Sequence, residues 1–385
     1  MSTFPLVFIA WTCLALVTWS YLAYPGVVML LARIAGRRPA GCDRLADDAL
    51  PAVAVIVAAF NEERHIARRI ENLLAQDYPP GRLRVLVGSD GSTDRTVELA
   101  SRFAGPRLAV HAFPANRGKA SVLNDLVAAA EAEVLVFTDA NTHFRPDTVR
   151  ELVAALDAGT AVACGELILQ KPSTGTNPDH RYWSLERRLK LAESAIGGLL
   201  GANGGVYALR RECFRPLRAD TICDDFVIAM NVAVAGRGLR YVPAAVATEE
   251  TPDDVGAEFH RRARIGTGNY QSLFRHPDFL LGGSWTLRFT YLSHKVLRWL
   301  TPHLLLIAFG ASALLWRDPL YAALALALAG GGALALLVFA TRERLPWPGA
   351  LRGLSYFGLL NLAFLVGFAR FATGNYRGSW RRTAR

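Results

Sequence analysis

No charged residue interrupts the sequence between Thr3 and Leu31, a stretch that is almost entirely apolar. A helix needs only about 20 apolar residues to cross the hydrocarbon core of a bilayer, so this stretch is long enough to span one. It has neither the basic start nor the short apolar core of a cleaved signal peptide. We therefore expect a retained transmembrane anchor over residues 1–35 and a chain that has part of its fold in lipid.

The composition indicates that only part of the chain lies in lipid. Hydrophobic residues make up 52% of the 385 residues, yet 20% are charged, and the charges cluster between Arg33 and Arg298. A central segment of this size is large enough for a complete hydrophobic core. The composition therefore excludes a secreted miniprotein, a disordered chain and a porin-like barrel.

Three more apolar segments lie near the other end of the sequence. Trp299–Trp316 and Pro319–Thr341 carry no formal charge, and a short charged loop separates them. The last segment, Gly353–Ala369, is only marginally long enough to span a bilayer. We expect a C-terminal transmembrane region over residues 299–372 with two or three spans.

Residues 284–298, immediately before these spans, predict a helix that lies in the membrane surface. Leu292 and Val296 fall on one helical face, and Arg288 and Lys295 fall on another. This pattern is typical of an interfacial amphipathic helix, and the neighbouring span favours that interpretation. The alternative is the buried face of an ordinary globular helix.

Basic residues at the ends of the spans predict the orientation of the chain. They are Arg33, Arg37 and Arg38 after the first span, and Arg342 and Arg344 after the third. Since Lys and Arg accumulate in cytoplasmic loops, we expect an inner (plasma) membrane protein whose central domain is cytosolic. If the last apolar segment crosses the membrane, the basic C-terminal tail lies outside. If that segment lies in the interface, the tail stays inside.

The net charge of +10 fits contact with anionic membrane lipid at the cytosolic edges of the spans. We therefore expect membrane lipid, and no nucleic acid, among the partners. The five cysteines are scattered and form no CxxC pair, so neither a zinc site nor a disulfide framework is expected.

Residues 50–280 alternate short apolar runs with helical stretches, which predicts an α/β domain. The expected strands are 53–58, 84–88, 108–112 and 134–138, and the expected helices are 63–76, 93–103 and 119–130. Continuous runs of Val, Ile, Leu and Ala are typical of strands buried on both faces of a largely parallel sheet.

Polar clusters follow three of these strands. They are Asn61-Glu62-Glu63, Ser89-Asp90-Gly91-Ser92-Thr93-Asp94 and Asp139-Ala140-Asn141. A single Asp at such a position is most often a helix cap, and Ser92 and Asp94 have this alternative. Ligands of parallel sheets bind beyond the carboxyl ends of the strands, so three clusters at one edge predict a binding site. The sequence contains no GxGxxG and no GxxxxGK[ST] motif, so it supports neither dinucleotide nor P-loop binding.

In their order and spacing, these clusters and four later motifs resemble the family 2 glycosyltransferases. The resemblance is to the membrane-embedded branch that includes cellulose, chitin and hyaluronan synthases, and it covers residues 50 to 300. The matching motifs are VIVAAFNE (55–62), SDGSTD (89–94), RGK (117–119), TDAN (138–141), NGG (203–205), CDD (223–225) and RRARI (261–265). The resemblance implies a GT-A fold, which is a Rossmann-like, mostly parallel sheet, here flanked by transmembrane helices.

The resemblance also implies roles for the donor side of the site. Asn61, Glu62, Asp90 and Lys119 would bind the nucleotide of a nucleotide-sugar. For Lys119 the alternative is a solvated residue at the start of a helix. The ligands of a divalent cation, Mg²⁺ or Mn²⁺, would be Asp139 and Asn141. The family has a second acid where this chain has Asn141, which binds the cation more weakly, but one carboxylate and phosphate oxygens suffice for Mg²⁺.

On the acceptor side, the resemblance makes Asp225 the general base, with Asp224 raising its pKa by like-charge repulsion. The alternative is that this pair caps a helix beginning at Phe226. A single base without a second nucleophile implies inversion of the anomeric configuration. The diphosphate and the acceptor would meet Arg261, Arg264, Asn203 and Gly204. For the two arginines the alternative is an amphipathic helix that faces lipid phosphates.

These inferences predict an inverting, metal-dependent hexosyltransferase of polysaccharide biosynthesis. It would move a sugar from a UDP-linked donor to a lipid-linked or growing cell-surface glycan acceptor. The alternatives are a membrane sugar-binding or transport subunit and a catalytically silent regulator. A transporter requires polar residues inside its spans, and a silent regulator has no need of Asp90, Asp139 and Asp225 together.

One departure from the family motif bears on product length. Processive relatives carry QxxRW where this chain has Arg261, Arg264 and Ile265. Ile presents no aromatic face on which an acceptor sugar can stack. We therefore expect the addition of one or a few sugars, unless another aromatic residue, such as Tyr270 or Trp183, supplies the stacking face.

Overall fold

The computed structural model describes residues 3–36, 45–170, 180–250, 255–342 and 344–376. Arg37, Arg38 and the arginines of the C-terminal tail, on which the expected orientation partly depends, lie outside these residues. The chain divides into two compact units, which are considered separately. The described residues of the sheet unit lie within Val28–Asp254 and His276–Thr290, and those of the helical unit lie within Met1–Val27, Val255–Arg275 and Tyr291–Tyr376.

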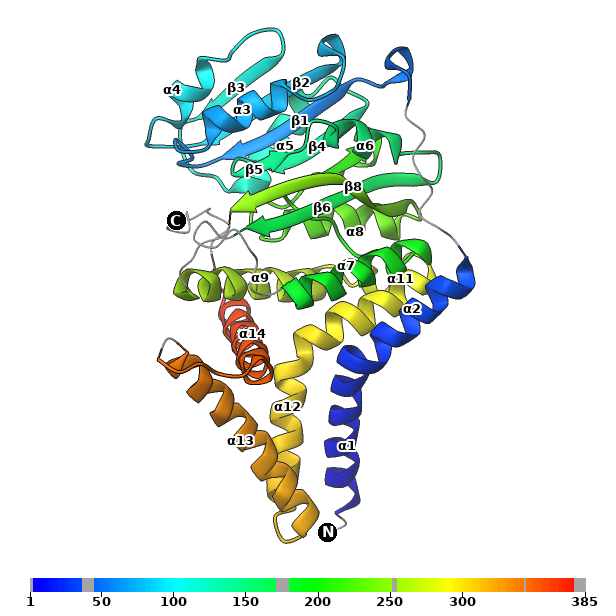
Figure 1. The fold of residues 1–385 in the computed structure, drawn as a ribbon, viewed down its shortest axis with the longest axis vertical. Helices are drawn as coiled ribbons and strands as arrows, with labels where there is room; N and C mark the ends of the chain where they lie inside the picture. Colours follow the sequence, from blue (N-terminus) through cyan, green and yellow to red (C-terminus); the bar gives the residue numbers. More distant parts are fainter. Residues whose placement is uncertain (1–2, 37–44, 171–179, 251–254, 343, 377–385) are drawn as a thin grey trace. The chain divides into compact units, whose positions relative to one another are not determined.

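The sheet unit is built on one eight-stranded sheet with the order β3-β2-β1-β4-β7-β6-β8-β5 (Figure 1). Its strands are β1 (Val53–Ala59), β2 (Leu83–Asp90), β3 (Leu108–Phe113), β4 (Val134–Asp139), β5 (Thr142–Phe144), β6 (Thr160–Gln170), β7 (Tyr207–Arg210) and β8 (Gly238–Glu250). β3, β2, β1 and β4 run parallel, as do β6 and β8, whereas β7 and β5 pair antiparallel with their neighbours. The predicted mostly parallel α/β sheet is confirmed.

Helices cover both faces of this sheet, which explains why every residue of β1 is buried. On one face, the odd-numbered residues of β1 share a core with α3 (Ile66–Leu74), α4 (Thr96–Ser101) and α6 (Thr148–Ala154). On the other face lies α5 (Lys119–Ala129), packed so closely that a Cβ added to Gly88 would come within 2.4 Å of Val122 Cγ1. The remaining α-helices of this unit are α7 (His180–Ala195), α8 (Asp224–Val234), α10 (Asp278–Leu281), α11 (Trp285–Thr290) and the part of α2 (Tyr24–Ala35) that follows Val27.

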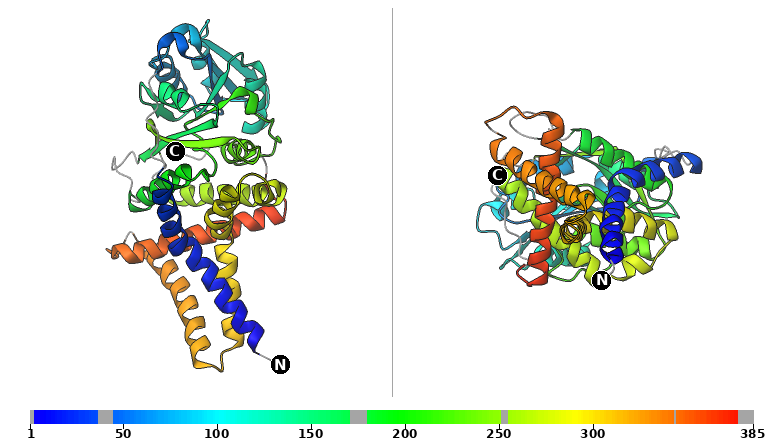
Figure 2. Two further views of the ribbon diagram at one scale, coloured as in Figure 1. Left: turned by 90° about the vertical axis from the view of Figure 1, so that its right-hand side faces the viewer. Right: turned by 90° about the horizontal axis from the view of Figure 1, so that it is seen from below.

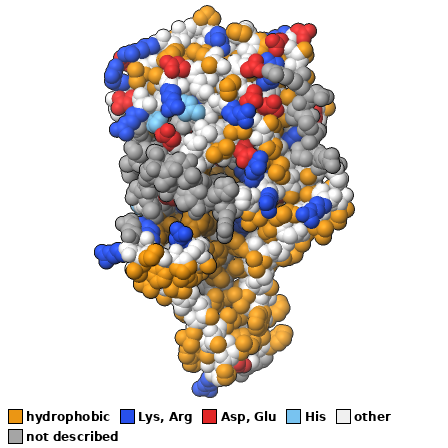
Figure 3. Space-filling view, viewed as in Figure 1, with side chains coloured by type: hydrophobic (Ala, Val, Ile, Leu, Met, Phe, Trp, Pro, Cys, Tyr) orange, Lys and Arg blue, Asp and Glu red, His pale blue; other side chains and the backbone are white. Residues whose placement is uncertain are grey.

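The helical unit contains long apolar helices. Its elements are α1 (Phe4–Thr18), a π-helical turn (Trp19–Ala23), the first residues of α2 (Tyr24–Ala35), α9 (Val255–Arg275), a second π-helical segment (Tyr291–Val296), α12 (Leu297–Leu314), α13 (Pro319–Thr341) and α14 (Gly349–Ala372). Within the described part of the chain, four continuous helices are long and apolar enough to cross a membrane: Phe4–Ala35, Trp285–Leu314, Pro319–Thr341 and Gly349–Ala372. Figure 3 shows a largely hydrophobic surface over α12 and α13, as expected for helices that face lipid.

The two π-helical segments lie against each other. Trp19 Nε1 donates a hydrogen bond to Ser293 Oγ at 3.1 Å, and Ser20 Oγ donates one to the Ser293 carbonyl at 2.9 Å. A π-helical turn displaces the regular backbone hydrogen bonds, so the Ser293 carbonyl can accept from a side chain of another helix. These bonds tie the N-terminal helix to the helix that continues as α12.

Within the helical unit, α14 runs across the direction of α12. Seen from below, α12 is viewed nearly end-on, whereas α14 lies along the plane of the picture (Figure 2). Glycines let α14 pack tightly on α9, because a Cβ on Gly367 would come within 2.8 Å of the Gly266 carbonyl carbon. By length and hydropathy alone, α14 is a candidate membrane span. Because α14 runs across α12, however, α12 and α14 cannot both follow the bilayer normal.

Candidate active site

The parallel register of the sheet brings three polar clusters to one edge. Ala59 at the end of β1 is paired with Ser89 of β2, and Ala58 is paired with Asp139 of β4. The residues that follow these positions therefore emerge side by side at the carboxyl edge, where ligands of such sheets bind.

The loops after β1 and β2 hold each other through Asn61. This residue has a φ of 55°, a left-handed conformation that Asn tolerates better than most residues. Its Oδ1 accepts the Thr93 N–H at 2.8 Å, and its own N–H donates to Ser92 Oγ at 3.0 Å. The Glu62 N–H donates to Thr96 Oγ1 at 2.8 Å. Asn61 and Glu62 are thus tied to the loop that follows β2.

Asp94 and Asp90 accept hydrogen bonds from the backbone of different segments. Asp94 Oδ1 accepts the Thr96 N–H at 2.9 Å, so it satisfies the first backbone N–H of α4, although the N-cap residue is Arg95. Asp90 is fully buried, and its two oxygens accept the N–H groups of Arg117 and Gly118 at 2.8 and 2.9 Å. The Asp90 carboxylate therefore holds the loop that leads into α5 and to Lys119.

Lys119 joins two of the acidic motifs. Its Nζ lies 2.9 Å from Asp139 Oδ1 and 3.2 Å from Asp224 Oδ2. Burial alone lowers the pKa of this ammonium, but the negative charges of Asp139 and Asp224 more than offset that effect and raise the pKa above its ordinary value. A permanently charged ammonium thus lies between the two carboxylates, which differs from the solvated lysine of the alternative interpretation.

Asp224 and Asp225 form the first turn of α8, which begins two residues before Phe226 and has Cys223 as its N-cap residue. Asp225 Oδ1 accepts the Phe226 N–H at 2.8 Å, so this carboxylate does make a helix-start hydrogen bond. Burial, followed by the negative charge of Asp224, raises the pKa of Asp225 to about 6. A carboxylate with this pKa can accept a proton near neutral pH and remain mostly ionised beforehand.

The loop containing Asn203 and Gly204 lies against Asp225. A Cβ added to Gly204 would come within 3.1 Å of Asp225 Oδ2, so a larger residue there would displace the carboxylate. Asn203 anchors the loop, since its Nδ2 donates to the Gly165 carbonyl at 2.6 Å and its Oδ1 accepts from Lys190 Nζ at 2.5 Å. The loop therefore forms a fixed wall beside Asp225.

Asp139 and Asn141, the expected metal ligands, each carry a side-chain oxygen of the kind that Mg²⁺ or Mn²⁺ binds. The Asn141 Nδ2 donates to Glu249 Oε1 at 3.1 Å, so its amide oxygen is the atom suited to a metal. No group of three or more His, Cys, Asp or Glu side chains able to hold a metal occurs among the described residues. One carboxylate and one amide oxygen fit a cation that also binds the phosphates of its ligand, as Mg²⁺ commonly does.

Arg261 and Arg264, the expected basic residues, lie on α9 of the helical unit. Arg261 is within 3.5 Å of Glu258, and the neighbouring Arg262 binds Glu258 at 2.6 Å and the Tyr356 hydroxyl at 3.0 Å. The Arg264 side chain is exposed. Arg262 therefore links α9 to α14 through Tyr356.

Three residues near the site were not singled out from the sequence. Glu249 is the buried partner of Asn141, and Arg69 is a fully buried arginine that contacts Thr138. Tyr207 is buried and stacks on Phe137 with ring centroids 4.9 Å apart. Only Arg69 carries a local signal, because it falls on the same helical face as the apolar residues of α3.

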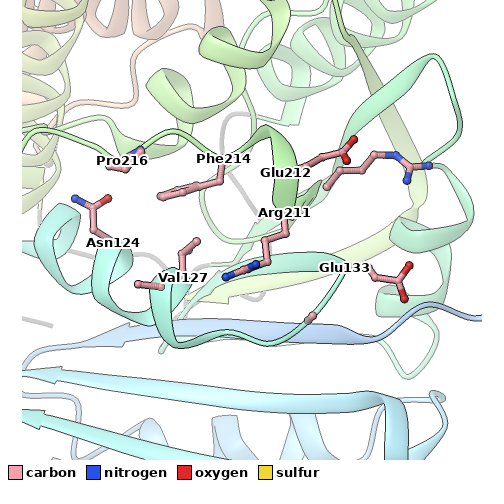
Figure 4. A pocket seen from close by; sticks show the side chains of 10 residues that line it. Asn124, Val127, Glu133, Arg211, Glu212, Phe214 and Pro216 are labelled. Atoms are coloured by element: carbon pink, nitrogen blue, oxygen red, sulfur yellow. The ribbon is translucent and has the colours of Figure 1, made fainter.

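A pocket of about 510 Å³ lies elsewhere in the sheet unit (Figure 4). Its lining residues are Asn124, Val127, Ala128, Ala132, Glu133, Arg210, Arg211, Glu212, Phe214 and Pro216. They surround the start of β4 and the end of β7, whereas Asp139 is at the other end of β4. The pocket is therefore separate from the carboxylate cluster.

Comparisons with known proteins agree with this geometry. Residues 54–217 match the family model described as Glycosyl transferase family 2. The chain therefore carries a family 2 glycosyltransferase domain, and the resemblance drawn from its motifs is confirmed.

The curated relatives are distant. A beta-monoglucosyldiacylglycerol synthase of Nostoc sp. is 25% identical over 287 residues, which cover 70% of this chain and 60% of that protein. An N-acetylglucosaminyltransferase of Rhizobium sp. is 25% identical over 360 residues, which cover 88% of this chain and 73% of that protein. The match thus spans less than two thirds of the first relative.

The fold also matches a solved structure. This is the mannosyltransferase PcManGT from Pyrobaculum calidifontis in complex with GDP-Man and Mn²⁺, with a TM-score of 0.71 and 22% identity. The match covers 96% of this chain and 100% of that one. At this identity the similarity concerns the fold, and it confirms the expected GT-A architecture.

Proposed function

We propose that this protein is an inverting glycosyltransferase that moves a sugar from a nucleotide-sugar to an acceptor hydroxyl. The observation that carries the proposal is the cluster of Asp225, Asp224, Lys119 and Asp139 at the carboxyl edge of a family 2 glycosyltransferase domain. It combines a carboxylate suited to accept a proton with a fixed positive charge suited to a phosphate ligand.

In this proposal Asp225 is the general base. Its carboxylate takes the proton from the acceptor hydroxyl as the hydroxyl oxygen forms a bond to the anomeric carbon of the donor. The bond from that carbon to the diphosphate breaks, and its electron pair leaves with the nucleoside diphosphate. A single displacement of this kind inverts the anomeric configuration. The Gly204 loop keeps the base from turning away from the acceptor.

The donor side would be formed by Asn61, Glu62, Asp90 and Lys119, with Asp139 and Asn141 holding Mg²⁺ or Mn²⁺. When bound, the cation would neutralise the charge that develops on the diphosphate. The Mn²⁺ in the mannosyltransferase complex supports the use of a divalent metal. We propose a UDP-sugar as the donor. A GDP-sugar is the second candidate, because the mannosyltransferase complex contains GDP-Man.

We propose that the acceptor is lipid-linked or a cell-surface glycan, with Arg261 and Arg264 near the diphosphate or acceptor. The name of the Nostoc relative, which refers to a diacylglycerol product, supports a lipid acceptor. The four apolar helices support an acceptor that reaches the enzyme through the membrane. A transport subunit is less well supported, because it explains neither Asp225 nor its raised pKa.

The full-length protein in detergent tests the proposal. It is incubated with a panel of UDP- and GDP-sugars and either Mg²⁺ or Mn²⁺, and the released nucleoside diphosphate is measured. We expect release with a small subset of donors, stimulated by membrane lipid extract. Absence of release with every donor, from protein that still binds UDP or GDP, would argue for a silent sugar-nucleotide binder.

We predict short products. Ile265 offers no stacking face, and Tyr270 is fully buried with its hydroxyl donating to the Trp299 carbonyl at 2.5 Å, so Tyr270 cannot replace the missing aromatic face. Trp183 lies where side chains are not described. Product length under limiting enzyme checks this prediction. Chains of tens of sugars that appear before short products accumulate would contradict it.

We propose that the sheet unit faces the cytosol and that α14 lies in the membrane interface, because α14 runs across α12. The end of α14 would then be on the same side of the membrane as the sheet unit. Single cysteines at Ala46, Arg317 and Thr373, all exposed positions, test this in intact cells with a membrane-impermeant maleimide.

We expect labelling of the Arg317 position only, and labelling of all three positions after permeabilisation. The unsubstituted chain, with its native cysteines, is the background control. Labelling of the Thr373 position from outside would establish α14 as a span, and labelling of the Ala46 position would reverse the orientation.

A further inference from the structure

Arg69 is a fully buried arginine on the apolar face of α3. Among the described residues no carboxylate forms an ion pair with it, and its Nε has no hydrogen-bond partner there. A buried charge without an ion pair is costly, and an apolar side chain of similar size would usually stabilise the fold more. Packing alone therefore does not explain an arginine at this position.

The Arg69 guanidinium contacts both ends of residues 138–144, the segment that carries Asp139 and Asn141. At one end, Arg69 Nη2 donates to Thr138 Oγ1 at 2.6 Å. At the other end, the guanidinium carbon lies 4.2 Å from the centre of the Phe144 ring.

A second link to Phe144 runs through Asn72. Arg69 Nη1 donates to Asn72 Oδ1 at 2.5 Å. The Asn72 amide in turn accepts the Phe144 N–H and donates to the Phe144 carbonyl, each at 2.9 Å. The planar guanidinium has donors in a rigid fork and can serve both ends at once, which a lysine ammonium cannot.

The same network extends to the wall beside Asp225. Thr138 Oγ1, having accepted from Arg69, donates its own proton to the Gly205 carbonyl at 2.7 Å. Gly205 directly follows Gly204, whose Cα faces the Asp225 carboxylate closely. One hydroxyl therefore links the strand that ends in Asp139 to the loop that confines Asp225.

We propose that Arg69 is a positioning residue for sugar transfer, and that through Thr138 it sets the distance between the metal-binding segment and the general base. The inference rests on the function proposed above. Neither Arg69 nor Thr138 touches the reacting atoms in this account. They fix the relative placement of Asp139 and Asp225, and an error of about 1 Å in such placement can cost about 10²-fold in rate.

Arg69 keeps its charge at neutral pH. Burial lowers its pKa to about 9, and the negative charge of Asp139 opposes that decrease. The guanidinium therefore stays charged over the pH range of the assays described below, and its charge acts on Asp139.

Thr138→Val is the test, because it removes one buried hydroxyl and keeps the shape of the side chain. Thr138→Ser restores the hydroxyl. Thr148→Val is the matched control, because Thr148 is also buried and its Oγ1, at the start of α6, donates to the Val246 carbonyl of β8 at 2.7 Å, a bond that involves neither Asp139 nor Asp225. For each protein we measure the melting temperature, kcat and donor KM with the donor that the wild type accepts, and Mn²⁺ affinity by electron paramagnetic resonance in the presence of UDP or GDP.

Both valine substitutions should lower the melting temperature, and Thr138→Val should lower it more, because its hydroxyl also accepts a hydrogen bond from the buried Arg69 guanidinium. Only Thr138→Val should lower kcat, by about 10–100-fold with little change in donor KM, and weaken Mn²⁺ binding, as loss of a residue that orients a metal ligand does. Thr138→Ser should recover most of both. Equal kcat and Mn²⁺ affinity in the two valine variants would overturn the inference.

Arg69→Met provides a second route if Thr138→Val does not fold. We expect a melting temperature near or above that of the wild type together with a loss of kcat of at least about 10-fold. Wild-type kcat in a stable Arg69→Met protein would overturn the inference. If the wild type itself releases no nucleoside diphosphate, the proposed function fails, and the Mn²⁺ affinities still decide whether Thr138 positions Asp139.

Discussion

Asp225→Asn is expected to abolish sugar transfer and to leave donor binding nearly intact. The amide keeps the size of the side chain and one oxygen that can accept the Phe226 N–H, but it cannot take a proton from the hydroxyl of the sugar acceptor. Loss of a positioned general base typically costs 10²–10⁴-fold in rate, or about 3–5 kcal/mol of transition-state stabilisation. The measurements are kcat for release of nucleoside diphosphate in the presence of acceptor, and the affinity for UDP or GDP with Mn²⁺.

Loss of folding would not explain this result, because the substitution should not destabilise the protein. The pKa of Asp225 is raised to about 6 in the folded state, so ionisation destabilises the fold progressively as pH rises from about 4 to 6. At pH 7 that cost is fully present, and the neutral amide removes it. We therefore expect a melting temperature at pH 7 that equals or exceeds that of the wild type.

The same pKa predicts the pH profile of the wild-type enzyme. Since the base must be ionised, kcat/KM should fall as pH decreases through about 6. The residual activity of Asp225→Asn should not show this decrease at low pH. Full activity in the variant, or a wild-type kcat/KM that stays constant down to pH 5, would show that Asp225 is not the general base.

Removal of the metal is expected to have the second large effect. Excess chelator should suppress transfer, and added Mg²⁺ or Mn²⁺ should restore it. Asp139→Ala should reduce kcat by roughly 10²–10³-fold, the usual loss when a group that stabilises transition-state charge is removed. In the same variant, Mn²⁺ binding in the presence of UDP or GDP should weaken. Turnover that persists in excess chelator would contradict a metal-dependent reaction.

Asn141→Asp sharpens this test, because sequence and structure predict different results. By motif alone, the substitution restores the second acid and should tighten metal binding. In the structure, Asn141 Nδ2 donates to the buried Glu249 Oε1 at 3.1 Å. A carboxylate at position 141 would lose that bond and repel Glu249. We therefore expect Asn141→Asp to lower kcat and Mn²⁺ affinity, and we expect the double variant Asn141→Asp, Glu249→Gln to recover both.

Much of the fold could be predicted from local patterns in the sequence. Fully buried strands such as β1 show continuous apolar runs, and the helix from Pro319 to Thr341 shows an uninterrupted apolar segment with the same ends in sequence and structure. The loops after β1, β2 and β4 could be placed at one edge because parallel strands share their direction. These features depend on residues close in the chain, where periodicity and length determine the structure.

The tertiary structure alone decided the features that depend on distant residues. Asn141 and Glu249 are 108 residues apart, and nothing local to either residue indicates that they pair. The burial of Arg69 and its hydrogen bond to Thr138 likewise arise only when α3 packs on the sheet. The direction of α14 follows from its glycine contact with α9 and not from its hydropathy, which by itself is that of a span. The composition of each segment and the spacing of its hydrophobic residues determined which helices and strands form. Which polar groups meet was decided by packing, since a buried donor or charge must find its partner wherever the fold brings one.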